Sequence, residues 1–368
     1  MADGPLAIVF GGPSPEHDIS ILTGLLCERV LRDAGHDVLP LYWARNGDWV
    51  QCPAGLEAKD FLEGPPKAGV RLSLDLRAGF GAKKGLGGPK PVALSAALNC
   101  CHGGTGENGG LNALFDLLGI PMSGGPAPLA ALGMDKLAFG ALLQASGIAT
   151  LPRVALTSVD PPFAGPYIVK PRFGGSSIGI EVVEDMATAR ALSTNVHLRA
   201  GAVVEPFTPG AVDLNMAFRT HPAFAVSLLE RPLAPSGEGI YSYAQKYLQA
   251  DGLVAAPREL PAQVPDAVTA EAERLTRAVV EVTGLRGLAR LDLLLVDDTL
   301  YVNEVNTTPG SMSLYLWPSS VAPAELLLSA VAEARAQQGL LDAGASFEPG
   351  VALRAAGGMA GKLGAIGR

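Results

Sequence analysis

Two carboxylates and an amide lie close together near the C-terminal end of the sequence, in a pattern that could hold a metal ion. Asp292 lies inside one apolar run, while Glu304 and Asn306 lie at the end of the next. Asp297-Asp298 supplies a turn between the runs, which predicts a β-hairpin. Strand pairing would bring Asp292 near Glu304, with Asn306 on the same face as Glu304. These hard oxygen ligands suit Mg²⁺ bound together with substrate phosphates, and a hairpin with ordinary surface acids is the alternative.

A lysine followed by a glycine-serine loop could bind phosphate. Lys170 ends an apolar run, and Gly174-Gly175-Ser176-Ser177 follows it closely. Backbone N–H groups and hydroxyls in such a loop can surround phosphate oxygens, while the lysine neutralises their charge. The segment is not a Walker P-loop, because no Gly-Lys-Ser/Thr precedes a helix. A flexible hairpin turn is the alternative, and the nearby metal pattern favours phosphate.

A third segment could recognise a nucleotide base. Glu205 and Phe207 stand at the end of the apolar run Val203-Val204. The carboxylate could accept a hydrogen bond from an adenine amino group, and the ring could cover the base. Packing of Phe207 in a core is the alternative.

The N-terminal segment supplies a strand, a glycine-rich loop, a helix and a second strand in that order. The apolar run 5–10 leads into Gly11-Gly12, and a helix at about 19–34 is followed by a strand at 37–42. This order is the opening of a doubly wound parallel sheet. Because the loop lacks the G-x-G-x-x-G pattern, a dinucleotide fingerprint is absent.

A second strand-to-loop junction follows an excursion in the chain. Residues 53–90 are rich in Gly, Pro and Lys and lack clean periodicity, so we interpret them as an insertion on the first domain. The apolar run 92–99 then leads into a loop with His102 and Glu107. Because the carboxyl ends of parallel strands meet at one edge, these side chains are expected near Glu16, where open α/β sheets bind ligands.

The length of 368 residues exceeds one compact core, so several domains are expected. We predict a Rossmann-like N-terminal domain at 1–132, a small central α+β domain at 133–211 and a C-terminal α+β domain at 212–340. The Gly- and Ala-rich residues 341–368 are expected to form a weakly ordered tail. Two long helices are predicted in the third domain, at about 265–283 and 323–338.

Composition excludes several classes of protein. A hydrophobic content of 48% against 17% charged residues excludes a disordered chain. The net charge of −8 argues against a general nucleic-acid or anionic-membrane binder. Neither a long apolar run nor a basic N-terminal signal is visible, which predicts a soluble, cytoplasmic protein. The cysteines lack metal-ligand spacing and are expected to be structural: Cys27, Cys52, Cys100 and Cys101.

Seven motifs, in order, resemble those of the ATP-grasp superfamily and, within it, the D-alanine–D-alanine ligases. The resemblance runs from about residue 6 to residue 318 and implies an ATP-grasp fold behind an N-terminal doubly wound parallel-sheet domain. The motifs are Gly11-Gly12-x-Ser14-x-Glu16, His102-Gly103-x-x-Gly106-Glu107-x-Gly109, Met134-Asp135-Lys136, Val169-Lys170-Pro171 with Gly175-Ser176-Ser177-x-Gly179, Tyr243-x-x-Lys246-Tyr247, Arg290-x-Asp292, and Glu304-x-Asn306-Thr307-x-Pro309-Gly310.

The resemblance implies a two-step reaction. ATP phosphorylates the carboxylate of a first D-alanine, and the amino group of a second then attacks the acyl phosphate. The products are the dipeptide for the peptidoglycan precursor, ADP and phosphate. The implied cofactors are ATP and Mg²⁺, with Mn²⁺ as a substitute. Small amino acids are the expected partners, in a homodimer, without nucleic acid or membrane.

The resemblance also assigns the nucleotide and metal ligands. Phosphates would be held by Lys136 and Lys170, and the Ser176-Ser177 loop would close over the transferred group. Asp213 would bind the ribose if the alignment absorbs one inserted residue after Gly210. The full set is Lys136, Lys170, Ser177, Glu205, Phe207 and Asp213 for ATP, and Asp292, Glu304 and Asn306 for the metal.

A further group would act on the amino acids. Glu16 would hold the ammonium group of the first D-alanine, with Ser176 and Tyr247 as its partners. His102 would lie near the substrate carboxylate, with Glu107 beside it, unless the histidine is structural. Arg290 and the backbone of Gly310 would stabilise the tetrahedral oxyanion. A salt bridge to Asp292 is the alternative for Arg290.

Three positions depart from the family pattern. Asn108 stands where aspartate is common, and Phe207 replaces a frequent tryptophan. Tyr315 stands where a serine hydroxyl contacts the carboxylate of the second amino acid, so the acceptor pocket is expected to be reshaped. Lys246 and Arg290 remain available for a carboxylate.

The resemblance leaves three functions to compare. Tyr247 favours an amine nucleophile, and hence an amide product, over the ester-forming members of the family. The leading hypothesis is a D-alanine–D-alanine ligase. The second is a ligase of the same architecture with another acceptor or donor, as in natural-product or mycosporine-type amide synthesis. The third is a catalytically silent nucleotide-binding module, against which the oxyanion arginine argues.

Overall fold

The N-terminal domain is built on a mixed seven-stranded sheet. In this computed structural model the structure describes residues 4–82, 88–233, 257–344 and 353–354. The strands lie in the order β6-β5-β4-β3-β2-β1-β7. Their bounds are β1 (Leu6–Gly11), β2 (Val38–Trp43), β3 (Trp49–Gln51), β4 (Val70–Asp75), β5 (Gly79–Ala82), β6 (Lys90–Pro91) and β7 (Ala96–Asn99).

The parallel part of this sheet is smaller than predicted. Strand β1 pairs in parallel with β2 on one side and β7 on the other, whereas β3 to β6 continue the sheet with antiparallel pairing. Residues 53–90, interpreted as an insertion or excursion on the first domain, contribute strands β4, β5 and the start of β6 to its sheet. These strands are short, and β4 alternates half-buried with exposed side chains, so their pattern in the sequence is weak.

Helices connect the parallel strands and support their carboxyl ends. The long helix α1 starts directly after Glu16 and packs on β1 and β2. Their bounds are α1 (His17–Asp33), α2 (Gly104–Glu107), α3 (Gly110–Leu117) and the 3₁₀ segment η1 (Ala58–Phe61). Both predicted strand-to-loop junctions thus end at one edge of the sheet.

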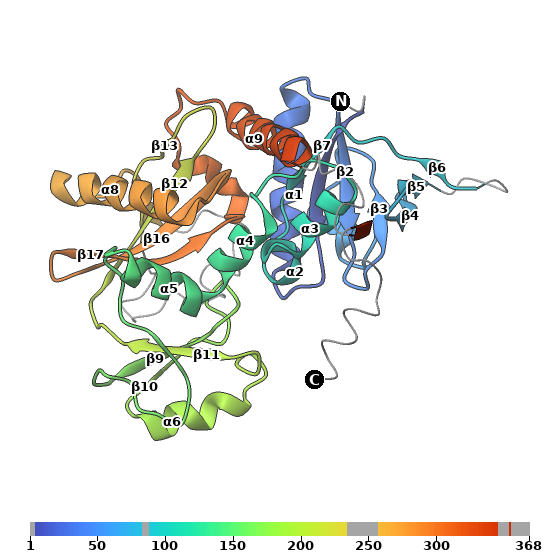
Figure 1. Cartoon of the computed structure of the whole chain (residues 1–368). Coiled ribbons are helices and arrows are strands. Elements are labelled where there is room, and N and C mark those ends of the chain that lie inside the picture. Colours follow the sequence, from blue (N-terminus) through green and yellow to red (C-terminus); the bar gives the residue numbers. More distant parts are fainter. Residues whose placement is uncertain (1–3, 83–87, 234–256, 345–352, 355–368) are drawn as a thin grey trace.

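The segment predicted as a central domain carries a small antiparallel sheet with the order β10-β9-β11-β8, whereas Phe139 and Leu143 of its first long helix lie in the core of the following sheet. Helix α5 begins at Lys136, and the Asp135 side chain caps it by accepting from the Leu137 and Ala138 N–H groups. The bounds are β8 (Val154–Ala155), β9 (Tyr167–Pro171), β10 (Glu181–Val183), β11 (Ala202–Pro206), α4 (Ala127–Met134), α5 (Lys136–Ala145), α6 (Met186–Ala191) and η2 (Leu192–Thr194). In Figure 1 this sheet and α6 form the lower lobe.

The C-terminal domain carries a second antiparallel sheet, β13-β12-β16-β17, covered by α8. Gly284 ends α8 in a left-handed conformation, which glycine adopts without steric cost. The bounds are β12 (Val212–Arg219), β13 (Ala225–Val226), β14 (Arg231–Pro232), β15 (Arg258–Glu259), α8 (Asp266–Thr283), β16 (Leu288–Val296), β17 (Thr299–Asn306), η3 (Gly310–Leu316) and α9 (Pro323–Gly344).

Helix α9 returns to the N-terminal domain. It contacts α1 and β7, and Figure 1 shows it lying across that domain. Its Leu326, Leu327 and Val331 belong to the same buried cluster as Phe10 and Leu31. The predicted end of this helix near residue 338 is wrong, because the helix-favouring stretch Leu340–Ala343 continues it. Apart from residues 341–344 and 353–354, the predicted tail lies outside the described residues.

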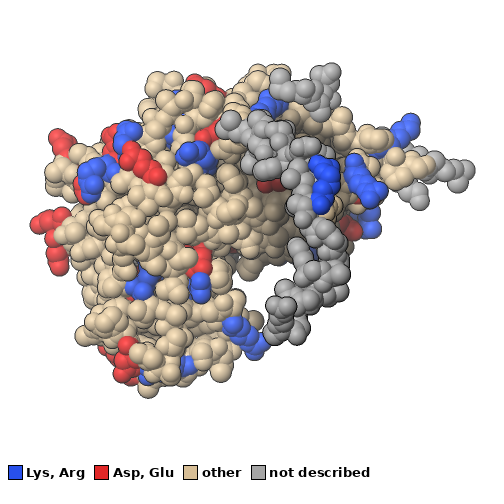
Figure 2. Space-filling view, in the orientation of Figure 1, with Lys and Arg blue, Asp and Glu red and all other residues tan. Residues whose placement is uncertain are grey.

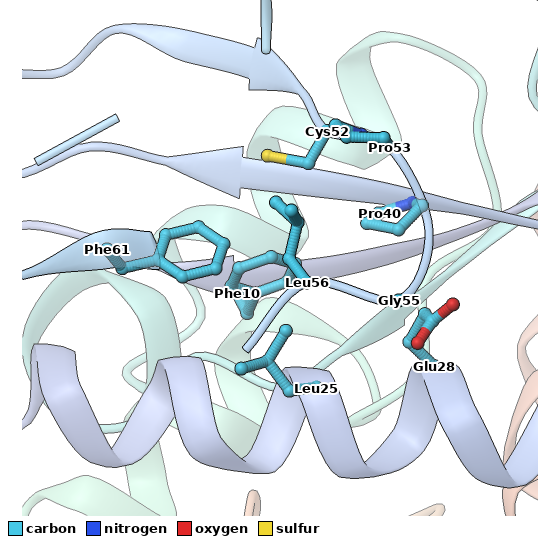
Figure 3. A pocket seen from close by; sticks show the side chains of 9 residues that line it. All are labelled: Phe10, Leu25, Glu28, Pro40, Cys52, Pro53, Gly55, Leu56 and Phe61. Carbon is cyan, nitrogen blue, oxygen red and sulfur yellow. The ribbon is translucent and has the colours of Figure 1, made fainter. Parts of the chain in front are cut away.

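A narrow apolar pocket between α1 and the sheet belongs to the core. Figure 3 shows Phe10, Leu25 and Phe61 around it, with the Glu28 carboxylate at one end. Glu28 is buried and pairs with Arg32 at 2.6 Å. Glu28 lies eleven residues past the start of α1, about 16 Å along the helix, so this pocket is separate from the polar loops at the sheet edge.

Candidate active site

The predicted hairpin forms between β16 and β17. Asp292 lies opposite Glu304 in the ladder. The two turn residues, Asp297 and Asp298, have φ of 43° and 65°. Two left-handed residues in a two-residue turn match the right-handed twist of the flanking strands, which explains how this turn joins them. The two carboxylates therefore share one site, as their spacing predicted.

Two cations neutralise the carboxylates of the hairpin. Arg290 donates from Nε to Asp292 Oδ1 at 2.6 Å and from Nη2 to Oδ2 at 2.8 Å. Asn306 Nδ2 donates to the same Oδ2 at 3.0 Å. Lys136 Nζ lies 2.8 Å from Glu304 Oε2. The salt bridge that was the alternative for Arg290 is thus formed, and it lies inside the predicted metal site.

Lys170 and Glu205 form a buried pair on neighbouring strands of the central sheet. Lys170 Nζ donates to Glu205 Oε2 at 2.8 Å and to Asn303 Oδ1 at 3.3 Å. Burial acts to raise the pKa of Glu205, but the charges of Lys170 and Arg153 outweigh it and hold that pKa below its usual value. Glu205 is therefore an ionised acceptor at neutral pH.

The glycine-serine loop after β9 meets the loop after β1. Ser176 Oγ donates a hydrogen bond to the Glu16 carboxylate. A Cβ at Gly103 would lie 2.2 Å from Glu16 Oε2, and Gly103 has φ of 66°. Only glycine leaves room for the carboxylate there. Three separate loops thus converge on Glu16.

The side chains of His102 and Glu107 both form hydrogen bonds with other residues of the protein. His102 Nε2 hydrogen-bonds with Thr23 Oγ1 at 2.8 Å, and burial lowers its pKa to about 4. Glu107 accepts from the Gly103 N–H at 2.9 Å and from the Thr308 N–H at 3.3 Å. Burial, followed by the charge of Glu16, raises the pKa of Glu107 to about 7. Glu107 therefore ties the loop after β7 to the loop after β17.

The segment after β17 makes an unusual turn. In η3, Ser311, Met312 and Ser313 all have φ near 50° (51°, 51° and 50°). Left-handed conformations are costly for such residues and persist where the surroundings hold them. Met312 and Ser313 are buried, and the Ser311 N–H donates to Thr23 Oγ1 at 3.2 Å. These contacts fix the turn that begins at Gly310.

The Tyr315 side chain contacts Glu230 and Arg258. Its Oη donates to Glu230 Oε2 at 3.4 Å, and the Arg258 guanidinium stacks over its ring at 4.3 Å. Arg258 Nη1 donates to Glu230 Oε1 at 3.0 Å. The Tyr315 hydroxyl therefore already has a carboxylate partner within the protein, and the reshaping of the acceptor pocket by Tyr315 stays a prediction.

Comparisons with known proteins cover nearly the whole chain. The family model described as D-ala D-ala ligase N-terminus matches residues 5–125, and D-ala D-ala ligase C-terminus matches 129–331. The D-alanine–D-alanine ligase of Bradyrhizobium sp. (strain ORS 278) is 31% identical over 334 residues, 85% of this chain and 89% of that protein. The corresponding protein of Mycobacterium sp. (strain JLS) is 30% identical over 363 residues, 91% and 96% of the two chains. The chain belongs to the D-alanine–D-alanine ligase family.

Solved structures of family members share the fold. The crystal structure of D-alanine–D-alanine ligase from Helicobacter pylori covers 89% of this chain and 98% of its own, with a TM-score of 0.67 and 23% identity. The VanG D-Ala:D-Ser ligase from Enterococcus faecalis covers 90% and 99%, with a TM-score of 0.73 and 19% identity. The predicted ATP-grasp fold is confirmed.

The donor set of the hairpin fits a divalent cation with a nucleotide. Asp292, Glu304 and Asn306 offer hard oxygen ligands from one surface, and Lys136 and Arg290 supply positive charge beside them. Among the described residues, no cluster of three His, Cys, Asp or Glu side chains could form a metal site alone. Two carboxylates with bound phosphates are the usual arrangement for Mg²⁺, so the set remains suitable.

The remaining predicted residues fall into two groups. Phe207 is half-buried beyond β11, and Asp213 is exposed on β12 opposite Leu294. Ser177 follows Ser176 with the same left-handed backbone. Lys246 and Tyr247 lie outside the described residues.

Two residues of the candidate site were not identified from the sequence. Arg153 and Asn303 both contact the Lys170–Glu205 pair or its partners. Arg153 is a lone charge between Pro152 and Val154 in an otherwise apolar stretch, and that isolation was a usable signal. Asn303 gave no signal, because it lies among the metal-motif residues without matching one.

Proposed function

We propose that the protein is an ATP-dependent carboxylate–amine ligase that joins two D-alanines into the dipeptide of the peptidoglycan precursor. The observation that carries this proposal is the position of Arg290 on the same hairpin as Asp292, Glu304 and Asn306. A site that only bound nucleotide would need the carboxylates and lysines but no arginine beside the reacting carbonyl.

At the phosphate end of the site, Arg290 and Lys136 would exchange their carboxylate partners for substrate groups. Asp292 and Glu304 would bind Mg²⁺ through their carboxylate oxygens, which frees Arg290 and Lys136 from their present ion pairs. When bound, Mg²⁺ neutralises charge on the phosphates and aligns the transfer. Lys136 can then bind a phosphate, and Arg290 can face the oxyanion that forms as the amine attacks.

The donor end would hold the first D-alanine at Glu16. Its carboxylate can bind the substrate ammonium, with Ser176 Oγ already hydrogen-bonded to it. His102 is neutral at physiological pH, so it can donate or accept a hydrogen bond without adding charge. Figure 2 shows a notch between the central lobe and the N-terminal domain, and acidic and basic side chains are interspersed over this face.

A different acceptor is the second candidate function. It is supported by Tyr315, which stands at the position of the family's carboxylate-binding serine and contacts Glu230, the partner of Arg258. One relative of the same fold is named a D-Ala:D-Ser ligase, so the fold accommodates more than one acceptor.

We also propose that the protein acts in the cytoplasm, where ATP is available, and as a homodimer. Among the described residues, no helix has the length and hydropathy needed to cross a membrane. Sedimentation of the full chain at several concentrations tests the dimer.

Incubation with ATP, Mg²⁺ and D-alanine tests the activity. The expected products, measured by mass spectrometry and a phosphate assay, are D-alanyl-D-alanine and phosphate in equal amounts. Phosphate release without the dipeptide, but with a mixed product when D-serine or glycine is added, would support the second candidate. No turnover with any amino acid would support a silent nucleotide-binding module.

A further inference from the structure

Arg153 joins three elements around the Lys170–Glu205 pair. Its side chain is 1% exposed, and Nη1 donates to the Lys136 carbonyl at 3.0 Å. Nη2 donates to the Asn303 carbonyl at 3.0 Å and to Thr150 Oγ1 at 3.2 Å. Nε lies 3.5 Å from Glu205 Oε1. One guanidinium therefore contacts the start of α5, strand β17 and strand β11.

Glu205 has a cation at each of its carboxylate oxygens. Lys170 Nζ binds Oε2 at 2.8 Å, while Arg153 faces Oε1. Within the part of the chain that the structure describes, neither Glu205 Oε1 nor Arg153 Nε has a hydrogen-bond partner. Glu205 is 1% exposed, and a buried carboxylate without a paired cation is strongly destabilising.

Lys170 and Arg153 differ in how freely their side chains can move. Lys170 is a flexible point charge that can turn to a phosphate. Arg153 is fixed by two backbone carbonyls and a hydroxyl. If Lys170 leaves Glu205 for ATP, Arg153 is the cation that remains beside the carboxylate.

We propose that Arg153 is a positioning residue for ATP, which keeps Glu205 ionised and in place when Lys170 moves to the phosphates. Glu205 can then accept a hydrogen bond from the adenine amino group while Lys170 serves the other end of the nucleotide. This rests on the proposed function, since it takes Lys170 and Glu205 as ATP ligands.

Gly140 provides the space that Arg153 occupies. A Cβ at Gly140 would lie 2.4 Å from Arg153 Cδ and 2.7 Å from Nε. Gly140 lies inside α5, where glycine is less favourable than alanine by about 0.5–1 kcal/mol. Gly140→Ala therefore displaces the guanidinium without removing it and without weakening the helix.

Three variants of the full chain distinguish the effect of the Arg153 charge from that of its position. Arg153→Gln removes the charge, Arg153→Lys keeps it, and Gly140→Ala shifts it. Arg190→Gln is the matched control, because Arg190 forms an exposed pair with Asp160 in the same domain. Binding of a non-hydrolysable ATP analogue with Mg²⁺ is measured by calorimetry, beside thermal unfolding and, for active protein, kcat and the KM for ATP.

The expected loss is in nucleotide affinity. Arg153→Gln and Gly140→Ala should raise the Kd about tenfold, and Arg153→Lys about two- to threefold, with kcat at saturating ATP within about threefold of the parent. The double variant Arg153→Gln/Glu205→Gln should bind no more weakly than Glu205→Gln alone. Arg190→Gln should be unchanged.

Several results would overturn the proposal. They are unchanged affinity in folded Arg153→Gln, equal losses for the lysine and glutamine variants, or independent effects of Arg153 and Glu205. If Arg153→Gln does not fold, Gly140→Ala decides, and parental affinity there rejects the role. A parent that binds the analogue but makes no dipeptide would reject only the ligase function, and a parent that does not bind it would reject both.

Discussion

At the scale of single residues, the candidate site is organised by ion pairs, and the proposed function requires them to exchange partners when substrate binds. Arg290 pairs with Asp292, and Lys136 pairs with Glu304, so each cation proposed to act in the reaction is bound to a carboxylate proposed to bind the metal. The sequence motifs predicted which residues gather here. They could not predict which partner each would take, because that depends on distances between side chains rather than on their order.

Arg290→Ala should lower kcat by about 10²- to 10³-fold and change the KM for ATP by less than about threefold, because the proposed role of the arginine is to stabilise charge that develops only in the transition state. Steady-state kinetics with varied ATP measure both constants. Arg274→Ala is the control, since Arg274 forms an exposed pair with Glu271 on α8. An equal loss of ATP affinity would contradict the oxyanion role.

His102 should make the folded protein less stable in acid. Burial lowers its pKa to about 4 from an ordinary value of 6.5, so the unfolded chain binds the proton more readily between these values. The stabilisation is present above about pH 6.5 and is lost as the pH falls toward 4. In His102→Gln, Tm should fall less steeply over this range, whereas His36→Gln, at an exposed histidine, should follow the parent. Parallel Tm curves for His102→Gln and the parent would reject the shift.

At the scale of elements, the β16–β17 hairpin was predictable and η3 was not. Two apolar runs around Asp297-Asp298 specify a hairpin locally, but the pairing of Asp292 with Glu304 depends on a register shift between Asp292 and Leu293, which the turn does not specify. The left-handed turn at Ser311–Ser313 is held by contacts with α1, which lies almost 300 residues earlier in the chain. The contact between Tyr315 and Glu230 joins residues 85 positions apart, so no local sequence pattern predicts it.

Tyr315→Ser should change the acceptor preference. The substitution removes the ring on which Arg258 stacks and the phenol that donates a hydrogen bond to Glu230. It therefore leaves more space beside Glu230 and removes the stacking contact of Arg258. The ratio of kcat/KM for D-alanine to that for D-serine or D-lactate should shift by about tenfold, whereas Tyr315→Phe, which keeps the ring, should shift it much less. Unchanged ratios in Tyr315→Ser would remove this residue from the acceptor pocket.

At the scale of the whole molecule, two contacts join the N-terminal domain to the C-terminal part of the chain. Helix α9 completes the core of the N-terminal domain, and Glu107 links that domain to the loop after β17. The general α/β order was readable from strand, glycine loop and helix. The antiparallel extension β3 to β6 was not, because β3, β5 and β6 have only two to four residues and β4 alternates half-buried with exposed side chains.

Leu327→Ala should lower the free energy of unfolding by about 2–5 kcal/mol, since Leu327 is fully buried between α9 and the N-terminal domain. Urea unfolding measures the change. Leu117→Ala, at a leucine that is 69% exposed on α3, should change it by less than about 0.5 kcal/mol. Similar small effects of both substitutions would show that α9 does not contribute to this core.

The transfer of ¹⁸O from donor to phosphate tests the central claim most directly. D-alanine labelled with ¹⁸O in its carboxylate is incubated with the enzyme, ATP and Mg²⁺, and the phosphate and dipeptide are analysed by mass spectrometry. If the carboxylate attacks the γ-phosphate, each dipeptide is accompanied by ADP and by one phosphate that carries one ¹⁸O from the donor. Dipeptide formed with unlabelled phosphate, or with AMP in place of ADP, would contradict the acyl-phosphate mechanism.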